Sequence, residues 1–269
     1  MFWDFWQYNF FLRALVAGFF LAVAAAILGL YLILRKDAML GHGLTHIAFA
    51  GVAVALFFDV VPFPVALLAA GLAAFFILKI REKAGLYGDT AVAIFSSLGM
   101  AVGIILASVA KDFNVNLLSF LFGNILAIRD IELYGAILLA FGVIGTLIFF
   151  YHELIYVTFD EESARAAGLA VDRLDALLAL LTAITVVIGM KIVGLLLVSA
   201  LLVIPGAAAL QLAGSFKKCT LLAVVLGAVS VVGGLNLAII LNWPASGAIV
   251  VTSGGIFLLV AALKRLRSA

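Results

Sequence analysis

Hydrophobic residues follow one another along this chain in long blocks, and short polar segments separate the blocks. A helix needs about 20 mainly apolar residues to cross the hydrocarbon core of a bilayer. The pattern predicts nine membrane-spanning helices, near residues 11–34, 44–60, 62–80, 91–109, 131–151, 175–190, 193–213, 219–241 and 245–263. We therefore expect an all-α membrane protein in which residues 1–269 form a single transmembrane domain.

The amino-acid composition also indicates a protein that lies in a lipid bilayer. Hydrophobic residues make up 67% of the chain and charged residues 11%, whereas a soluble domain carries about 25% charged residues. The net charge of +2 gives no reason to expect a nucleic-acid partner. Cys219 is the only cysteine, so the chain can form neither an internal disulfide nor a thiolate cluster for a metal.

Lysine and arginine are distributed unevenly between the two sides of the predicted bundle. If the nine spans alternate in direction, one side holds twelve of the 16 basic residues: Arg35, Lys36, Lys79, Arg81, Lys83, Arg165, Arg173, Lys217, Lys218, Lys264, Arg265 and Arg267. Basic residues concentrate on the cytoplasmic side of membrane proteins. We therefore expect the N-terminus outside and the C-terminus in the cytoplasm. If residues 117–128 crossed the membrane as well, the second half would be inverted.

Two of the three histidines, His42 and His46, are the first candidates for chemistry. Residues four apart share one face of a helix, with their β-carbons roughly 6 Å apart. Imidazole nitrogen is a good ligand for zinc and a weaker one for manganese or iron. Polar side chains at membrane depth are costly and are usually functional. The spacing therefore favours a two-histidine metal site, and the alternative is a pair of helix-end histidines bonded to backbone carbonyls or water.

The segment near residues 158–172 contains the one polar helix of any length. Asp160 is placed to cap the helix N-terminus, Glu161 and Glu162 stand in its first turn, and Gly168 is placed to end it. The pattern predicts a short helix on the cytoplasmic side. It is either a plain connecting helix on the membrane surface, which the pattern alone favours, or an element that docks a soluble partner.

Two other stretches interrupt the apolar pattern. Residues 117–128 are too few to cross the bilayer, so we expect a re-entrant or interfacial segment. Within it, Ser119 and Asn124 line a polar path or cap helices. Pro205 lies inside a predicted span, where proline removes a backbone donor and kinks the helix. Pro205 therefore marks either a hinge or a static bend.

Motifs for several kinds of enzyme are absent from the sequence. The chain has no phosphate-binding loop of the Gly-x-x-x-x-Gly-Lys-Ser/Thr type, no Gly-x-Ser-x-Gly motif and no His-Glu-x-x-His motif. A proton-coupled carrier usually places acidic residues in the middle of a span, and none is evident here. If the chain transports a solute uphill, we expect the ATP hydrolysis to occur in a separate subunit.

Five stretches resemble, in the same order, the permease subunit of zinc/manganese/iron ABC importers: residues 34–53, 119–126, 160–168, 198–205 and 244–250. The resemblance covers nearly the whole chain and implies a type II importer fold without enzymatic activity. It also implies cytoplasmic ATPase subunits, an extracytoplasmic metal-binding protein, and a homodimer in a bacterial or archaeal plasma membrane. The residues that it implies for coupling to the ATPase are Asp160, Glu161, Glu162, Ala164, Gly168 and Leu169.

The chain departs from that family at one position. The family usually has aspartate after the glycine that corresponds to Gly41, and this aspartate and a histidine four residues later are implicated in holding the metal. Carried over, those positions are His42 and His46. Imidazole in place of carboxylate favours zinc over manganese. We therefore expect a transported Zn²⁺ ion and no permanently bound cofactor; otherwise, metal selection occurs elsewhere. The alternative function is a stand-alone carrier or channel for a metal or small solute.

Overall fold

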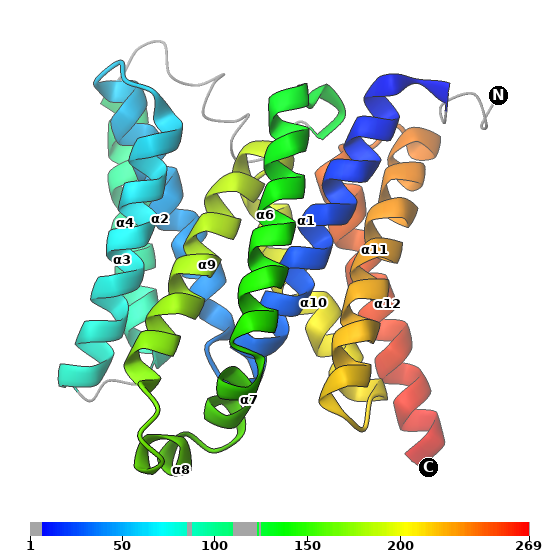
Figure 1. Ribbon diagram of the computed structural model, residues 1–269. Coiled ribbons are helices and arrows are strands. Elements are labelled where there is room, and N and C mark those ends of the chain that lie inside the picture. The colour runs from blue at the N-terminus through cyan, green and yellow to red at the C-terminus, as the bar shows by residue number, and fades with distance from the viewer. Residues whose placement is uncertain (1–6, 85–87, 110–122, 124, 269) are drawn as a thin grey trace. The chain divides into compact units, whose positions relative to one another are not determined.

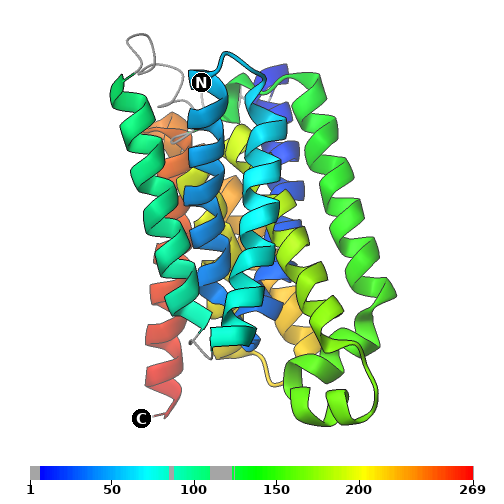
Figure 2. The same ribbon diagram turned by 90° about the vertical axis from the view of Figure 1, so that its left-hand side faces the viewer.

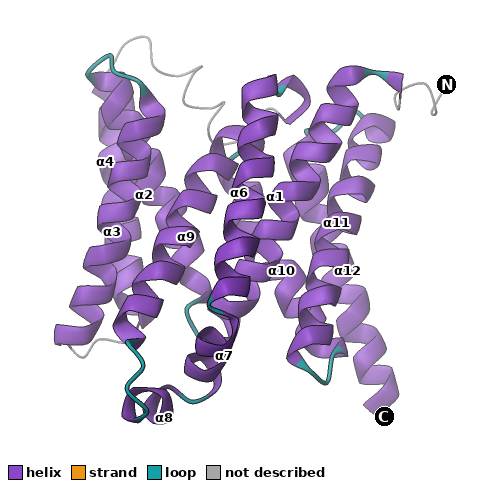
Figure 3. Cartoon of the chain, viewed as in Figure 1, coloured by secondary structure: helices purple, strands orange, loops and turns teal. Residues whose placement is uncertain are grey.

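The computed structural model describes residues 7–84, 88–109, 123 and 125–268, and within these ranges it contains helices and turns but no strand (Figures 1 and 3). Nine of the described helices are long and apolar enough to cross a membrane. They are α1 (Asn9–Leu34), α2 (Ala38–Phe57), α3 (Pro62–Ala84), α4 (Gly88–Val109), α6 (Asp130–Phe149), α9 (Val171–Val193), α10 (Leu195–Leu212), α11 (Phe216–Leu241) and α12 (Ala245–Ser268). The prediction of nine spans is confirmed.

The second span begins earlier than we expected. We predicted residues 44–60, but α2 starts at Ala38 and ends at Phe57. Gly41 and Gly43 lie inside the helix and are buried. A β-carbon at Gly43 would lie 2.3 Å from Cγ1 of Val92 in α4. This glycine therefore allows close helix packing, and His42 and His46 both belong to the regular helix.

The chain divides into two compact units. The first comprises Met1–Leu30, Phe122–Gly142 and Ile188–Ala269, and the second comprises Tyr31–Leu121 and Val143–Val187. In the first unit α10, α11 and α12 contact one another. Glycines bring its helices close together: a β-carbon at Gly234 would lie 2.4 Å from the Cα of Ile249.

In the second unit α2 packs against both α3 and α4 (Figure 2). Gly99 and Gly103, four residues apart on α4, face α2. A β-carbon at Gly99 would lie 3.1 Å from the Cα of Ile47, and one at Gly103 would lie 2.7 Å from the ring of Phe49. These two glycines therefore allow α2 and α4 to approach each other closely, as small residues do between membrane helices.

Outside these contacts the second unit exposes large apolar side chains. Leu68 and Leu72 of α3, and Leu98 and Ile105 of α4, are each more than half exposed. In a soluble protein such a surface would be an aggregation hazard, whereas membrane-spanning helices bury such a surface against lipid or against other transmembrane helices. The apolar faces of α3 and α4 therefore agree with their assignment as spans.

Two short helices follow α6 in the second unit: α7 (Tyr151–Phe159) and α8 (Glu161–Ala166). Figure 1 shows α7 at the lower end of α6 and α8 at the lower end of α9. The first unit also contains a short 3₁₀ helix, η2 (Ile125–Ala127). Most of the predicted segment 117–128 lies outside the described residues, and so do Ser119 and Asn124.

Candidate functional site

His42 and His46 lie together on one face of α2. Their Nε2 atoms are 3.2 Å apart, and the two rings are nearly perpendicular, with centroids 4.7 Å apart. Two nitrogen ligands of a tetrahedral zinc ion, each about 2.0–2.1 Å from the metal, lie about 3.3 Å from one another. The observed separation of the Nε2 atoms therefore fits a shared zinc ion, and it is also the length of a hydrogen bond between the two nitrogens.

The two histidines are partly buried, and few polar contacts are made around them. Thr45 lies between the two histidines in the sequence and is fully buried. Its hydroxyl group donates a hydrogen bond of 2.5 Å to the backbone carbonyl of His42. The Nδ1 atom of His46 is buried and has no hydrogen-bond partner. Among the residues that the structure describes, no three His, Cys, Asp or Glu side chains gather into a metal-binding group. The pair thus offers two ligands, a number that suits transient binding better than permanent binding.

The predicted coupling segment is formed by α8 and its two caps. Asp160 separates α7 from α8, and its carboxylate accepts a hydrogen bond from the backbone N–H of Ser163 at 3.0 Å. Hydrogen bonding from Ser163 lowers the pKa of the Asp160 carboxyl below its ordinary value. The predicted N-cap is therefore confirmed, and Glu161 and Glu162 occupy the first helical turn as expected.

The C-terminal end of α8 also agrees with the prediction. Gly168 has a φ angle of +85°, a conformation that glycine adopts readily. The N–H of Gly168 donates to the carbonyl of Arg165, and the N–H of Leu169 donates to the carbonyl of Ala164, both at 3.1 Å. This pair of bonds is a Schellman motif. Ala164 is fully buried, so one side of this short helix packs against the protein.

Arg165 fastens α8 to the beginning of α9. Its guanidinium forms ion pairs with Glu161 at 3.2 Å and with Asp172 at 2.9 Å. The hydrogen bonds to Asp172 and to Glu161 raise the pKa of Arg165. Arg165 and Asp172 are both exposed, so these contacts orient α8 more than they stabilise the fold.

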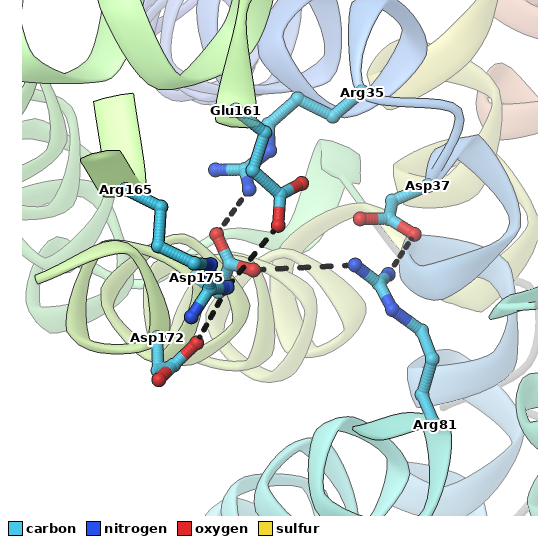
Figure 4. A network of polar contacts seen from close by, with 7 residues as sticks. All are labelled: Arg35, Asp37, Arg81, Glu161, Arg165, Asp172 and Asp175. Atoms are coloured by element: carbon cyan, nitrogen blue, oxygen red, sulfur yellow. Dashed lines mark hydrogen bonds and ion pairs between the residues drawn. The ribbon is translucent and has the colours of Figure 1, made fainter. Parts of the chain in front are cut away.

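Sequence reasoning missed a second cluster of charges. Arg35 pairs with Asp175 in the first turns of α9, Arg81 of α3 donates to Asp37 at 2.5 Å, and Arg81 also lies 3.9 Å from Asp175 (Figure 4). We call Arg35, Asp37, Arg81 and Asp175 the charge junction. From the sequence, Arg35 and Arg81 indicated only which side of the membrane the connecting segments face. The available signal was that each of the four charges directly adjoins an apolar block.

A cavity of about 450 Å³ opens beside the charge junction, within the second unit. The side chains that line it come from α3, α8 and α9: Phe75, Leu78, Lys79, Arg81, Glu161, Arg165, Asp172, Asp175 and Ala176. The cavity wall therefore joins residues of the predicted coupling segment to residues of two spans.

Pro205 lies inside α10, as the sequence indicated, and it is buried. Its role as a hinge or as a static bend stays open. His152, the third histidine, is exposed on α7 and does not belong to the pair on α2.

Comparison with known proteins identifies the family. The chain matches the ABC 3 transport family over residues 7–264. It is 35% identical over 251 residues to the manganese transport system membrane protein MntC of Listeria monocytogenes, an alignment that covers 93% of this chain and 89% of that protein. It is 29% identical over 246 residues to the high-affinity zinc uptake system membrane protein ZnuB of Haemophilus influenzae, covering 91% of this chain and 94% of that protein.

Comparison of structures gives the same result. The fold resembles a chain of PsaBC from Streptococcus pneumoniae, solved in complex with Fab, with a TM-score of 0.86 and 31% identity. The similarity covers 97% of this chain and 95% of that chain. The predicted fold and the family resemblance are thereby confirmed. The chain belongs to the ABC 3 transport family, in which it is a multi-pass membrane permease and not a catalytic subunit.

Proposed function

We propose that this chain is the permease through which an ABC importer moves a divalent transition metal into the cytoplasm, with zinc preferred over manganese. Relatives named for manganese and for zinc match the chain at similar identity, so identity alone does not choose between the metals. The observation that carries the proposal is the 3.2 Å separation of the Nε2 atoms of His42 and His46.

The chemistry of the pair favours zinc. Manganese prefers oxygen ligands, whereas neutral imidazole suits zinc. In the pair as it stands, one Nε2 donates a hydrogen to the other, so a cation enters only when both nitrogens are free of protons. Two ligands leave the remaining coordination positions to water or to other groups, and the ion can then depart. The pair is therefore a transient binding site for the transported ion.

ATP hydrolysis belongs to separate cytoplasmic subunits in this proposal, because the chain lacks a phosphate-binding loop. An extracytoplasmic metal-binding protein delivers the ion, and a second copy of the chain completes the pathway as a homodimer. The N-terminus lies outside and the C-terminus in the cytoplasm of a bacterial cell. The helix α8 docks on the ATPase through its acidic first turn, which includes the exposed Glu161 and Glu162.

Reconstitution into proteoliposomes tests the proposal. The permease, with its ATPase and binding protein, should import radioactive zinc only when ATP is supplied. His42→Ala, His46→Ala and the double variant should slow zinc uptake while leaving the assembly intact. His152→Ala is the matched control and should transport normally. Unchanged uptake in the double variant would refute the ligand role, and zinc uptake by the permease alone would favour a stand-alone carrier.

A further inference from the structure

The charge junction joins three parts of the second unit. Arg35 and Asp37 lie in the turn between α1 and α2, Arg81 lies near the end of α3, and Asp175 lies in the first turns of α9 (Figure 4). Each carboxylate touches an arginine: Asp175 contacts Arg35, and Asp37 contacts Arg81 at 2.5 Å. A longer contact of 3.9 Å between Arg81 and Asp175 links these two ion pairs to each other.

These charges are largely withdrawn from solvent. The side chain of Arg35 is 6% exposed and that of Asp175 is 14% exposed, and the Arg81–Asp37 pair is also mostly covered. Burying two positive and two negative charges costs solvation energy that their attraction only partly returns. Apolar side chains of similar size would therefore be at least as stabilising, so stability alone does not explain the charge junction.

The charge junction is also incompletely satisfied. The Nη1 atom of Arg35 is buried without a hydrogen-bond partner. A small cavity of about 10 Å³ adjoins Arg35, Asp37 and Asp175, and the larger cavity adjoins Arg81 and Asp175. The side chains therefore have room and unused hydrogen-bonding capacity to change partners, a property of elements that switch between two arrangements.

The ion pairs of α8 lie close to the charge junction, on the wall of the same cavity. Arg165 of α8 binds Asp172 at 2.9 Å, and Asp172 precedes Asp175 by three residues on α9. Glu161 of α8 lines the same cavity as Arg81 and Asp175. A displacement of α8 therefore changes the charges that Arg81 and Asp175 experience.

Asp37 of the charge junction lies at the start of α2. Asp37 occupies the N-cap position of this helix but makes no side-chain capping hydrogen bond. Aspartate is a favoured N-cap residue because its carboxylate can accept a hydrogen bond from a backbone N–H of the first turn. Here the carboxylate of Asp37 binds Arg81 instead. His42 follows five residues later on the same helix.

We propose that the charge junction transmits movement of α8 to the helix that carries the histidine pair, with Arg81 as the positioning residue that links Asp175 to Asp37. This inference rests on the proposed function. In this role Arg81 does not contact the metal. Loss of Arg81 should therefore separate ATP hydrolysis from zinc movement without changing the affinity for zinc.

The test uses the full complex in proteoliposomes and measures zinc imported per ATP hydrolysed, together with the KM for zinc. Arg81→Gln should lower the zinc-to-ATP ratio by about tenfold, while hydrolysis and KM stay within about twofold of the parent values. Arg81→Lys should restore part of the ratio. Lys217→Gln is the control and should leave the ratio unchanged, because Lys217 is an exposed cation of α11 that belongs neither to the charge junction nor to the wall of the cavity.

A second variant keeps the test decisive if Arg81→Gln fails to assemble. Replacing both partners, in Arg81→Met with Asp37→Leu, removes the link without leaving an unpaired buried charge, and it should uncouple equally. An unchanged zinc-to-ATP ratio in either assembled variant would overturn the inference, and so would loss of the ATPase from the purified complex. Failure of the parent complex to import zinc would instead refute the proposed function.

Discussion

At the scale of single residues, the proposed function makes the side chain at position 42 the one that governs which metal the site prefers. His42 and His46 present two nitrogen ligands and no negative charge to an incoming cation. An ion with two positive charges gains less electrostatic stabilisation from such a pair than from a carboxylate and a histidine. Zinc binds imidazole well and tolerates this loss, whereas manganese depends more on oxygen ligands.

Changing His42 to Asp should therefore move selectivity toward manganese. We expect the ratio of zinc to manganese uptake to fall by about tenfold, which corresponds to about 1.4 kcal/mol. Competition between the two metals in ATP-driven uptake measures this ratio. His152→Asp, which changes the exposed histidine of α7, should leave the ratio unaltered. Equal ratios for His42→Asp and the parent would mean that other residues select the metal.

At the scale of helices, glycine determines how closely neighbouring elements pack. A β-carbon at Gly29 of α1 would lie 1.6 Å from the backbone carbonyl oxygen of Leu202 in α10. A backbone atom cannot move aside as the end of a side chain can. By contrast, a β-carbon at Gly135 of α6, in the same unit, would meet nothing within 4 Å.

Gly29→Ala should therefore destabilise the protein by about 1–3 kcal/mol, and Gly135→Ala should be neutral or add up to about 1 kcal/mol because alanine favours helices. Thermal unfolding of the detergent-solubilised chain measures both. A melting temperature of Gly29→Ala equal to that of Gly135→Ala would show that α1 and α10 do not pack this closely.

The helix α8 carries the second prediction at this scale. Glu161 is already paired with Arg165, so a change there disturbs the structure of α8 itself. Glu162 is exposed in the same turn and tests docking more cleanly. Glu162→Lys should weaken co-purification of the ATPase by about fivefold, as expected for an exposed charge contact. Asp59→Lys, on the loop predicted to be outside, is the control, and equal ATPase recovery from both variants would exclude docking through Glu162.

The sequence predicted those helical features that depend on neighbouring residues. Blocks of apolar residues were sufficient for nine spans, and Asp160 with Gly168 was sufficient for the ends of α8. The start of α2 was missed, because Gly43 resembles a helix breaker until Val92 is placed against it. The charge junction was missed for the same reason, since Arg35 and Asp175 are 140 positions apart in the chain.

At the scale of the whole molecule, the distribution of basic residues makes a prediction about orientation. With Cys219 replaced by Ser, a cysteine introduced at Ser163 of α8 should react with a membrane-impermeant maleimide only in inverted vesicles. A cysteine introduced at Asp59 should react only in intact cells. Both positions are exposed. The reverse labelling pattern would invert the proposed topology and place α8 out of reach of a cytoplasmic ATPase.

The proposed function of the whole molecule depends on a zinc ion that binds between His42 and His46. Equilibrium dialysis of the purified permease against saturating zinc, followed by elemental analysis, counts the bound ions directly. The parent chain should hold one more zinc ion than the His42→Ala/His46→Ala variant, and a His152→Ala variant should hold as many zinc ions as the parent. The same zinc content in the parent and the double variant would contradict the account.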